Sequence, residues 1–176
     1  LREVTIDNGI LKINGQRVKL RGVCRHELYP EVGRALREHH WLKDIKLMKE
    51  ANINAVRCSH YPPHPRFLEL CDEYGFYVLN EVPIGFGHDI QHDPILLGAM
   101  LSRAQRTVWR DRNHPSVIIW DIGNENPLYG LQEAAAEYVK RMDPTRPLLY
   151  PGENFVGLDK SFASGMADFI DIIATH

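Results

Sequence analysis

The fold is indicated most directly by residues 53–79, which read INAVRCSHYPPHPRFLELCDEYGFYVL. Residues 53–58 are expected to form a strand. A helix is expected from Pro65, where a missing N–H costs nothing, to Gly75, a natural residue just after a helix. Residues 76–79 are apolar throughout, which is typical of a parallel strand buried on both faces. The stretch therefore predicts one strand–helix–strand unit of a parallel sheet.

The same alternation continues on both sides of this unit. The expected strands are residues 20–24, 117–122, 148–150 and 169–174, and the expected helices are residues 41–51, 93–110 and 131–142. Asn14-Gly15 lies between two alternating segments and predicts a tight hairpin before the first core strand. Repeated strand–helix units predict an α/β protein with a parallel sheet and helices packed outside it.

About six such units fit either a doubly wound sheet or part of an eight-stranded barrel. The polar residues separate the two, because they gather just after the strands, where a barrel builds its active site: His26 and Glu27, His60, Glu81, Asn124 and Glu125, Glu153 and His176. No G-x-G-x-x-G follows the first strand, which disfavours a dinucleotide-binding fold. We therefore predict a partial (β/α)8 TIM barrel at residues 18–176, preceded by a linking β-hairpin at residues 1–17.

The composition is that of an ordinary globular protein, with 44% hydrophobic and 25% charged residues. A net charge of −2 without a polybasic run argues against a nucleic-acid surface, and no apolar stretch approaches the roughly 20 residues of a membrane span. The first residues, LREVTIDNGI, lack a secretory pattern and an initiator Met, so we expect a processed chain or an excised piece. Three cysteines without C-x-x-C spacing predict small buried side chains rather than disulfides.

The chemistry is indicated by residues 111–127, which read DRNHPSVIIWDIGNENP. A buried strand delivers Asn124 and Glu125 together into a turn bounded by glycine and proline. A carboxyl group at the edge of an apolar barrel is partly desolvated, which favours the protonated form that a general acid needs. The adjacent amide can hold a substrate hydroxyl. From the residues alone, Glu125 is either a general acid or an exposed glutamate in a loop.

Three blocks of the sequence resemble glycoside hydrolase family 2. Residues 54–79 are similar to the first characteristic block of that family, and residues 111–125 are similar to its acid/base block. RGVCRHE, residues 21–27, resembles the strand that opens the barrel in the family's β-galactosidases. The blocks follow the family's order and spacing. The resemblance implies a TIM-barrel catalytic domain, which in this family usually follows β-sandwich domains.

The resemblance also implies a retaining mechanism, in which one carboxyl acts as acid and then base while a second attacks the anomeric carbon. Glu125 matches the acid/base residue, and Asn124 matches the residue that bonds the sugar 2-hydroxyl. Arg57 matches an arginine that supports the nucleophile, with a purely structural ion pair as the alternative. His26 and His60 match substrate-contacting histidines, although both could instead have only structural hydrogen bonds.

Other acidic residues are matched less directly. Glu81 follows the third strand, so it either contacts substrate or supports residues that do. The family's nucleophilic glutamate comes from the seventh strand, whereas this chain ends after the sixth, and Glu153 is no positional match. We therefore expect the chain alone to be inactive. Asp121 stands at a position where small residues are usual in the family. It could either form a hydrogen bond below the site or perturb Glu125.

In metal-dependent β-galactosidases of the family, the loop after the third strand supplies a glutamate and a histidine to Mg²⁺. Gly85 and Gly87 stand where those ligands would fall, and His88, Asp89 and His92 nearby have a different spacing. A hard cation needs several oxygen ligands, so we expect no metal and no other cofactor.

Together these features predict a retaining β-glycosidase that acts on a carbohydrate substrate, most simply a terminal β-galactoside. A β-glucuronide or another substrate of the family is the first alternative. A carbohydrate-binding fragment without turnover is the alternative from another class, and Glu125→Gln should abolish turnover in an enzyme but hardly weaken binding in a module. Neither nucleic acid nor a membrane is an expected partner, and a homo-oligomer of the full-length parent stays open.

Overall fold

The computed structural model describes residues 2–85, 93–125, 130–152 and 170–175. Its main feature is a six-stranded sheet in which the strands follow chain order and each neighbouring pair is parallel. The strands are β4 (Gly22–Arg25), β5 (Ala55–Cys58), β6 (Tyr77–Val82), β7 (Val117–Ile122), β8 (Leu148–Gly152) and β9 (Ile172–Thr175). The helices are α1 (Glu38–Glu50), α2 (Pro65–Tyr74), α3 (Leu97–Asp111) and α4 (Leu131–Met142), with a short 3-10 helix η1 (Pro94–Leu96) before α3.

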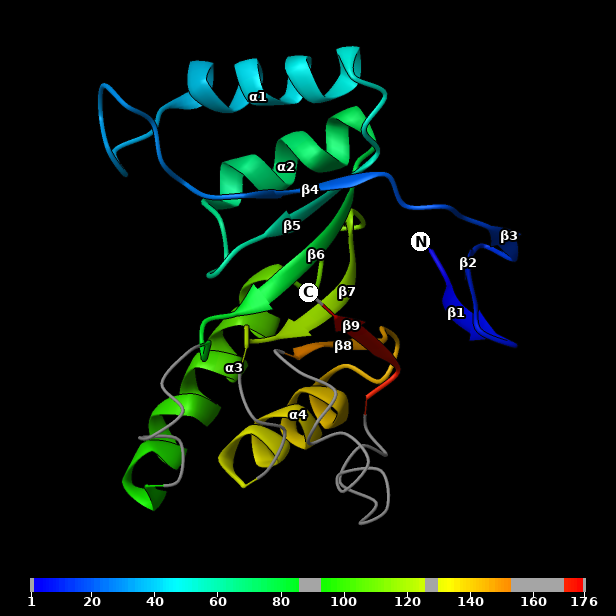
Figure 1. Cartoon of the computed structure of the whole chain (residues 1–176), viewed down its shortest axis with the longest axis vertical. Coiled ribbons are helices and arrows are strands. Elements are labelled where there is room, and N and C mark those ends of the chain that lie inside the picture. The colour runs from blue at the N-terminus through cyan, green and yellow to red at the C-terminus, as the bar shows by residue number, and fades with distance from the viewer. Residues whose placement is uncertain (1, 86–92, 126–129, 153–169, 176) are drawn as a thin grey trace.

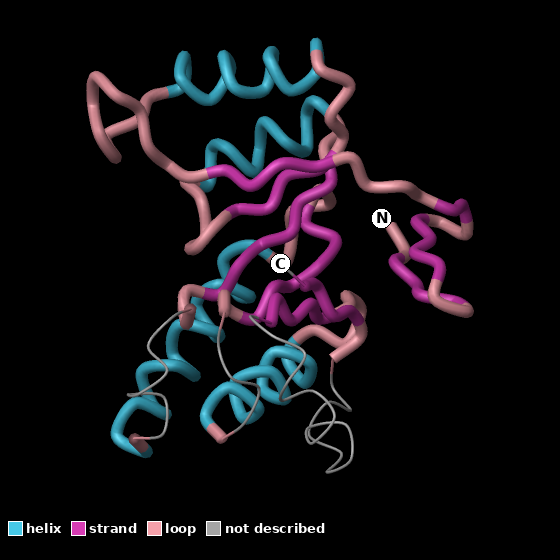
Figure 2. The backbone as a smooth tube through the Cα atoms, in the orientation of Figure 1, coloured by secondary structure: helices cyan, strands magenta, loops and turns pink. Residues whose placement is uncertain are grey.

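The sheet curls into a half-barrel with the helices around it (Figures 1 and 2). Helices α1 and α2 lie beside β4 and β5, whereas α3 and α4 lie beside β7 and β8. This arrangement confirms the predicted α/β partial TIM barrel. Within the described residues, β4 and β9 each pair on one side only. Cys24 on the edge strand β4 is therefore exposed, and the prediction of burial is wrong for it, whereas Cys58 and Cys71 are buried.

A three-stranded antiparallel sheet precedes the barrel and lies to one side of it in Figure 1: β1 (Val4–Asp7), β2 (Ile10–Ile13) and β3 (Gln16–Arg17). The predicted hairpin at Asn14-Gly15 is confirmed. A second Asn-Gly turn at residues 8–9 adds a strand that the sequence prediction missed. Both asparagines have φ of 50° and the glycines have φ of 74° and 75°, as a two-residue hairpin turn requires. Val4 packs with Ile118 and Leu149, so the small sheet covers part of the large one.

Strand β7 lies at the centre of the molecule, and all of its residues are buried. Trp120 packs in the cluster that the helices cover, and its indole N–H donates to Asp143 at 2.9 Å. Ile119 belongs to the separate cluster that includes Val4 of the small sheet. Because β7 separates two apolar clusters, its continuous apolar sequence is the one expected for a strand buried on both faces.

The bounds of two elements differ from the prediction in a way that matters for the site. Helix α1 begins at Glu38 rather than residue 41, because Arg37 N donates to His40 Nδ1 at 3.0 Å and caps the earlier turn. Strand β6 extends to Val82, so Glu81 lies within the strand rather than after it. Smaller differences are a 3-10 turn at residues 94–96 before α3, and a last strand that begins at residue 172 rather than 169.

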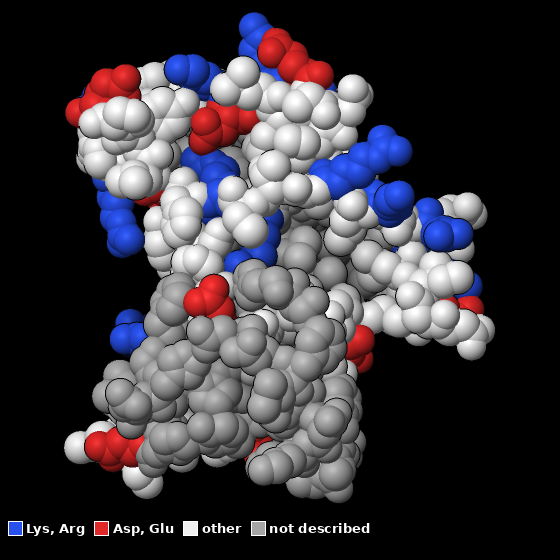
Figure 3. All heavy atoms as spheres, viewed as in Figure 1, with Lys and Arg blue, Asp and Glu red and all other residues white. Residues whose placement is uncertain are grey.

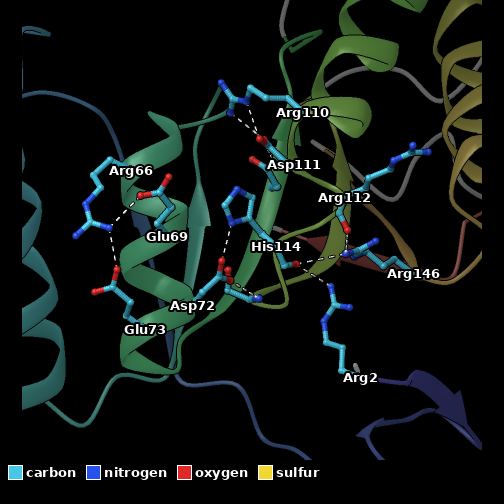
Figure 4. A network of polar contacts seen from close by, with 12 residues as sticks. Arg2, Arg66, Glu69, Asp72, Glu73, Arg110, Asp111, Arg112, His114 and Arg146 are labelled. Carbon is cyan, nitrogen blue, oxygen red and sulfur yellow. Dashed lines mark hydrogen bonds and ion pairs between the residues drawn. The ribbon is translucent and has the colours of Figure 1, made fainter.

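Residues 111–115, the first part of the block that resembles the family's acid/base block, lie before the amino end of β7. The Asp72 carboxylate of α2 contacts Nδ1 of His114 at 2.6 Å. The carbonyl of His114 accepts bonds from Arg2 at 3.3 Å and from Arg146 at 3.4 Å (Figure 4). These contacts fasten β7 to α2 and to the N-terminal segment. This half of the block is therefore structural, at the end of β7 opposite to Glu125.

Basic and acidic side chains are interspersed around α1 and α2 on the face shown in Figure 3. The net charge of the chain is −2. None of the helices in the described ranges is long and apolar enough to cross a bilayer.

Candidate active site

Five of the six predicted site residues lie at the carboxyl ends of three adjacent strands, and the sixth, His26, follows the neighbouring strand β4. Arg57 is on β5 and His60 follows it, Glu81 is near the end of β6, and Asn124 and Glu125 follow β7. The carboxyl ends of parallel strands meet at one edge of a barrel, which is where barrel enzymes place their active sites. The three strands thus bring together residues that are far apart in the sequence.

Asn124 and Glu125 lie in a sharp turn after β7. Gly123 and Glu125 both have positive φ, 77° and 53°. A left-handed conformation costs a glutamate about 1–2 kcal/mol, so its surroundings have to hold it. The N–H of Glu125 donates to the carbonyl of Pro151 at 3.0 Å, which ties the turn to β8. Glu125 is half-buried, whereas Asn124 is buried.

Gly85, which follows β6, lies close against this turn. A Cβ atom on Gly85 would be 3.0 Å from the backbone nitrogen of Asn124 and 3.2 Å from its Cβ. Contacts this short force one of the two segments to move. A larger residue here would therefore require the segment of Asn124 to give by a few tenths of an ångström.

Arg57 connects the three strands. Its Nε donates to Asp121 Oδ2 at 2.5 Å, and its Nη2 lies 2.7 Å from Glu81 Oε2. Nη2 also donates to Asn124 Oδ1 at 3.1 Å and to the carbonyl of Gly123 at 3.3 Å. One guanidinium group therefore holds two carboxyl groups and the turn that carries Glu125.

Two buried carboxyl groups face this single positive charge. Burial raises the pKa of Asp121 to about 7, and Arg57 opposes the rise. Burial, together with the charge of Asp121, raises the pKa of Glu81 to about 9, again against the effect of Arg57. Because one guanidinium neutralises one carboxylate, the arrangement favours a proton on Glu81 at neutral pH, with Asp121 paired to Arg57.

His60 lies beside Glu81, and His26 packs against His60. His60 Nδ1 is 3.1 Å from Glu81 Oε2 and 3.3 Å from Oε1. The rings of His26 and His60 meet edge to face, with their centroids 5.1 Å apart. The residues joined by one continuous set of contacts are therefore His26, Arg57, His60, Glu81 and Asn124. Glu125 adjoins this set through Asn124, and the roles of all six stay predictions.

Asp121 is the site residue whose partner was not predicted. It is fully buried, and an acid within an apolar strand indicates a nearby cation. That cation, Arg57, is 64 positions away in the sequence, so the pairing depends on how the strands are arranged. Of the two effects left open for Asp121, the structure has a hydrogen bond within the site network.

Among the described residues, no group of three His, Cys, Asp or Glu side chains is placed to hold a metal ion. Several candidates from the sequence lie outside the described residues: Gly87, His88, Asp89, His92, Glu153 and His176. Within the described site, the carboxyl oxygens of Asp121 and Glu81 contact Arg57.

Comparison with known sequences identifies a family and its members. The family described as "Glycosyl hydrolases family 2, TIM barrel domain" matches residues 4–174. A β-galactosidase of Yersinia pestis bv. Antiqua (strain Angola) is 48% identical over 157 residues, which cover 86% of this chain and 15% of that protein. A β-galactosidase of Yersinia pseudotuberculosis serotype O:3 (strain YPIII) gives the same values. The chain thus spans about 15% of the length of the curated relatives it matches.

Solved structures of similar fold come from enzymes named for acidic sugars. A β-D-glucuronidase of Dictyoglomus thermophilum has a TM-score of 0.86 at 27% identity, over 99% of this chain and 32% of that one. A β-glucuronidase of Ruminococcus gnavus in complex with D-glucuronic acid has a TM-score of 0.87 at 28% identity, and the match covers 100% of this chain and 30% of that one. A family 2 β-galacturonidase of Eisenbergiella tayi bound to galacturonate has a TM-score of 0.82 at 29% identity, and the match covers 89% of this chain and 29% of that one.

Proposed function

The chain belongs to the TIM-barrel domain of glycosyl hydrolases family 2, and from this premise we propose that the protein hydrolyses β-glycosidic bonds of carbohydrates with retention of configuration. Glu125 is the general acid/base of the proposed reaction. The observation that carries the proposal is the turn after β7, where a left-handed backbone presents Glu125 and Arg57 holds the adjacent Asn124.

In the first step, the Glu125 carboxyl gives its proton to the glycosidic oxygen while a carboxylate attacks the anomeric carbon. The bond to the leaving group breaks, and a covalent glycosyl–enzyme forms. In the second step, the Glu125 carboxylate takes a proton from water, and the water oxygen displaces the nucleophile. Asn124 binds the sugar 2-hydroxyl in both steps, with its own oxygen committed to Arg57.

We place the nucleophile outside the described residues. Glu81 and Asp121 both contact Arg57, but both are fully buried. The nucleophile of a retaining pair has to reach the anomeric carbon from about 5–5.5 Å across the scissile bond. A fully buried carboxyl does not offer an oxygen to the sugar. Glu81 and Asp121 therefore support the site, and His26 and His60 are the proposed additional contacts to the sugar.

The proposed substrate is a neutral terminal sugar, with a β-galactoside first. The relatives at 48% identity are named β-galactosidases, whereas the solved uronidases share 27–29% identity. The Arg57 charge is already committed to Asp121 and Glu81, so it is a poor partner for a sugar carboxylate. A β-glucuronide is the second candidate, because the solved β-glucuronidases cover nearly the whole chain with similar geometry.

The proposed reaction needs no metal ion. Gly85 has no side chain that could bind a metal ion, and an added Cβ would lie only 3.0 Å from the backbone nitrogen of Asn124. The carboxyl groups of Glu81 and Asp121 contact Arg57, and no group of three His, Cys, Asp or Glu side chains among the described residues is placed to hold a metal ion.

The experiment measures p-nitrophenol release by the full-length protein encoded by the gene, from β-galactoside, β-glucoside, β-glucuronide and β-galacturonide. Glu125→Gln is expected to lower kcat about 10²–10⁴-fold, the usual contribution of a general acid/base. Glu133→Gln makes the same change in the first turn of α4 and should leave the rate unchanged. Release that survives Glu125→Gln would contradict the assignment of the acid/base.

Retention is tested separately with Glu125→Ala and a substrate that has an activated leaving group. Azide should restore turnover and yield the β-glycosyl azide, because it attacks the glycosyl–enzyme without help from a base. An α-azide would contradict retention. Sugar binding by the folded protein without release from any member of the panel would indicate a binding module instead of an enzyme.

A further inference from the structure

Asp121 is a charged residue in the middle of a fully buried strand. Its side chain is fully buried, and Oδ2 accepts a bond from Arg57 Nε at 2.5 Å. In the described part of the chain, the other oxygen, Oδ1, has no hydrogen-bond partner. Burying a carboxyl group with one unpaired oxygen is unfavourable. The contact with Arg57 is therefore the interaction that accounts for an acid at this position.

Arg57 transmits this constraint to Asn124. A guanidinium group is planar and rigid, so a bond that holds Nε also sets the direction of Nη2. Nη2 donates to Asn124 Oδ1 at 3.1 Å. The oxygen of the amide thus accepts from Arg57, and the NH2 group is its donor toward a further partner.

We propose that Asp121 is a positioning residue for the sugar 2-hydroxyl: it holds Arg57 by Nε, so that Nη2 keeps the Asn124 amide oriented with its NH2 group toward the substrate. Glu81 does not replace it, because Glu81 contacts Nη2, at 2.7 Å, as Asn124 and the carbonyl of Gly123 also do, and contacts that all meet at one nitrogen leave the guanidinium free to pivot about it. Asp121 does not touch the sugar. The inference rests on the proposed function, since it takes Asn124 as the residue that binds the 2-hydroxyl.

The test compares kcat/KM of the full-length protein on p-nitrophenyl β-D-galactoside and on its 2-deoxy analogue, or on the same pair for the sugar that the panel selects. Asp121→Ala is expected to lower kcat/KM on the parent glycoside about 10- to 100-fold, the effect of losing a well-placed hydrogen bond. On the 2-deoxy analogue the loss should be less than about threefold, because the supported bond is absent there.

Asp121→Asn keeps an oxygen acceptor for Arg57 Nε, so it should recover most of the activity that alanine loses. Asp121→Ser replaces Asp121→Ala if the alanine variant does not fold. Asp111→Asn is the matched control, because Asp111 is a second buried aspartate, paired with Arg110 and Asn80. Asp111→Asn should change kcat/KM by the same factor on both substrates.

An equal loss on both glycosides in Asp121→Ala would overturn the inference and make Asp121 a structural residue. Asn124→Ala tests the premise independently. It should lose activity on the parent glycoside and not on the 2-deoxy analogue. If Asn124→Ala loses equally on both, the role of Asn124 in the proposed function is wrong. If Asp121→Ala loses activity equally on both glycosides while Asn124→Ala loses it only on the parent glycoside, the role proposed for Asn124 stands and the role proposed for Asp121 is wrong.

Discussion

Glu81 is buried between Arg57 and His60, and its proton links the stability of the fold to pH. Burial raises the pKa of this carboxyl from its ordinary 4.5 to about 9. Between these pH values the folded protein keeps a proton that the unfolded chain has released, so the free energy of unfolding falls as pH rises. Asp121, with a pKa of about 7, acts in the same direction at lower pH.

We expect Glu81→Gln to flatten this dependence, because glutamine resembles the protonated acid and does not ionise. The measurement is the unfolding midpoint of the full-length protein at about pH 6 and about pH 9. The unfolding midpoint of the wild type should fall further than that of the variant over this interval. Glu69→Gln, an exposed acid paired with Arg66, should follow the wild type. Parallel profiles for Glu81→Gln and the wild type would mean that Glu81 is ionised in the fold.

Gly85→Ala tests how closely the segment after β6 constrains the turn after β7. The added Cβ would lie 3.0 Å from the backbone of Asn124, so we expect kcat/KM to fall at least about tenfold through misplacement of the site. Gly98→Ala is the control, since Gly98 in α3 has nothing within 4 Å of an added Cβ. That variant should keep full activity and gain about 0.5–1 kcal/mol of stability. Unchanged kcat/KM in Gly85→Ala would show that the segment after β6 moves to accommodate the added methyl group and does not constrain the turn after β7.

At the scale of single elements, β7 is held at one end and carries the proposed acid/base at the other. Asp72 of α2 accepts a bond from the N–H of Ser116 at 2.8 Å and contacts His114 at 2.6 Å, just before the strand begins. We expect Asp72→Ala to lower the free energy of unfolding by about 2–3 kcal/mol, because it leaves buried donors unpaired. The turn with Glu125 lies at the far end, so kcat/KM of the folded variant should stay within about twofold of wild type.

Denaturant unfolding and steady-state kinetics of the full-length protein check this separation. Asp7→Ala removes an exposed carboxylate paired with Lys12 and should cost less than about 1 kcal/mol. A loss of kcat/KM in Asp72→Ala as large as the loss of stability would mean that the two ends of β7 are not independent.

The elements were predictable where their signals are local. Pro65 and Gly75 mark the ends of α2 by backbone chemistry alone, and the structure has the helix between them. The start of α1 depends on a cap between Arg37 and His40, and the end of β6 on its pairing with β7. Neither interaction is visible as a run of residue types. The contact between Arg57 and Asp121 spans 64 positions, so the sequence indicated that a buried acid needed a partner without naming it.

At the scale of the whole molecule, the barrel was predictable because polar residues follow successive strands, and the observed strand order confirms it. The contacts among the site residues were not predictable from the sequence, because they depend on how side chains from β5, β6 and β7 meet. The substrate is not determined by the described residues, since proteins of the same fold carry the names of different sugars.

We expect the intact enzyme to work without divalent cations. The full-length protein is incubated with EDTA, desalted, and assayed with and without added Mg²⁺. Its kcat/KM should be the same in all samples, because Gly85 has no side chain to bind a metal ion and the carboxyl groups of Glu81 and Asp121 contact Arg57. A loss that Mg²⁺ restores would contradict the proposed metal-free site.

The two ends of β7 have a consequence for how such enzymes diversify. The strand is fastened before its start through His114 and bound to β8 after its end, where the N–H of Glu125 meets Pro151. The proposed proton donor therefore stands on a fixed support. Relatives that share this fold are named for galactosides, glucuronides and galacturonides. We expect the side chains that select a sugar to differ among such proteins while the support of the proposed acid/base stays the same.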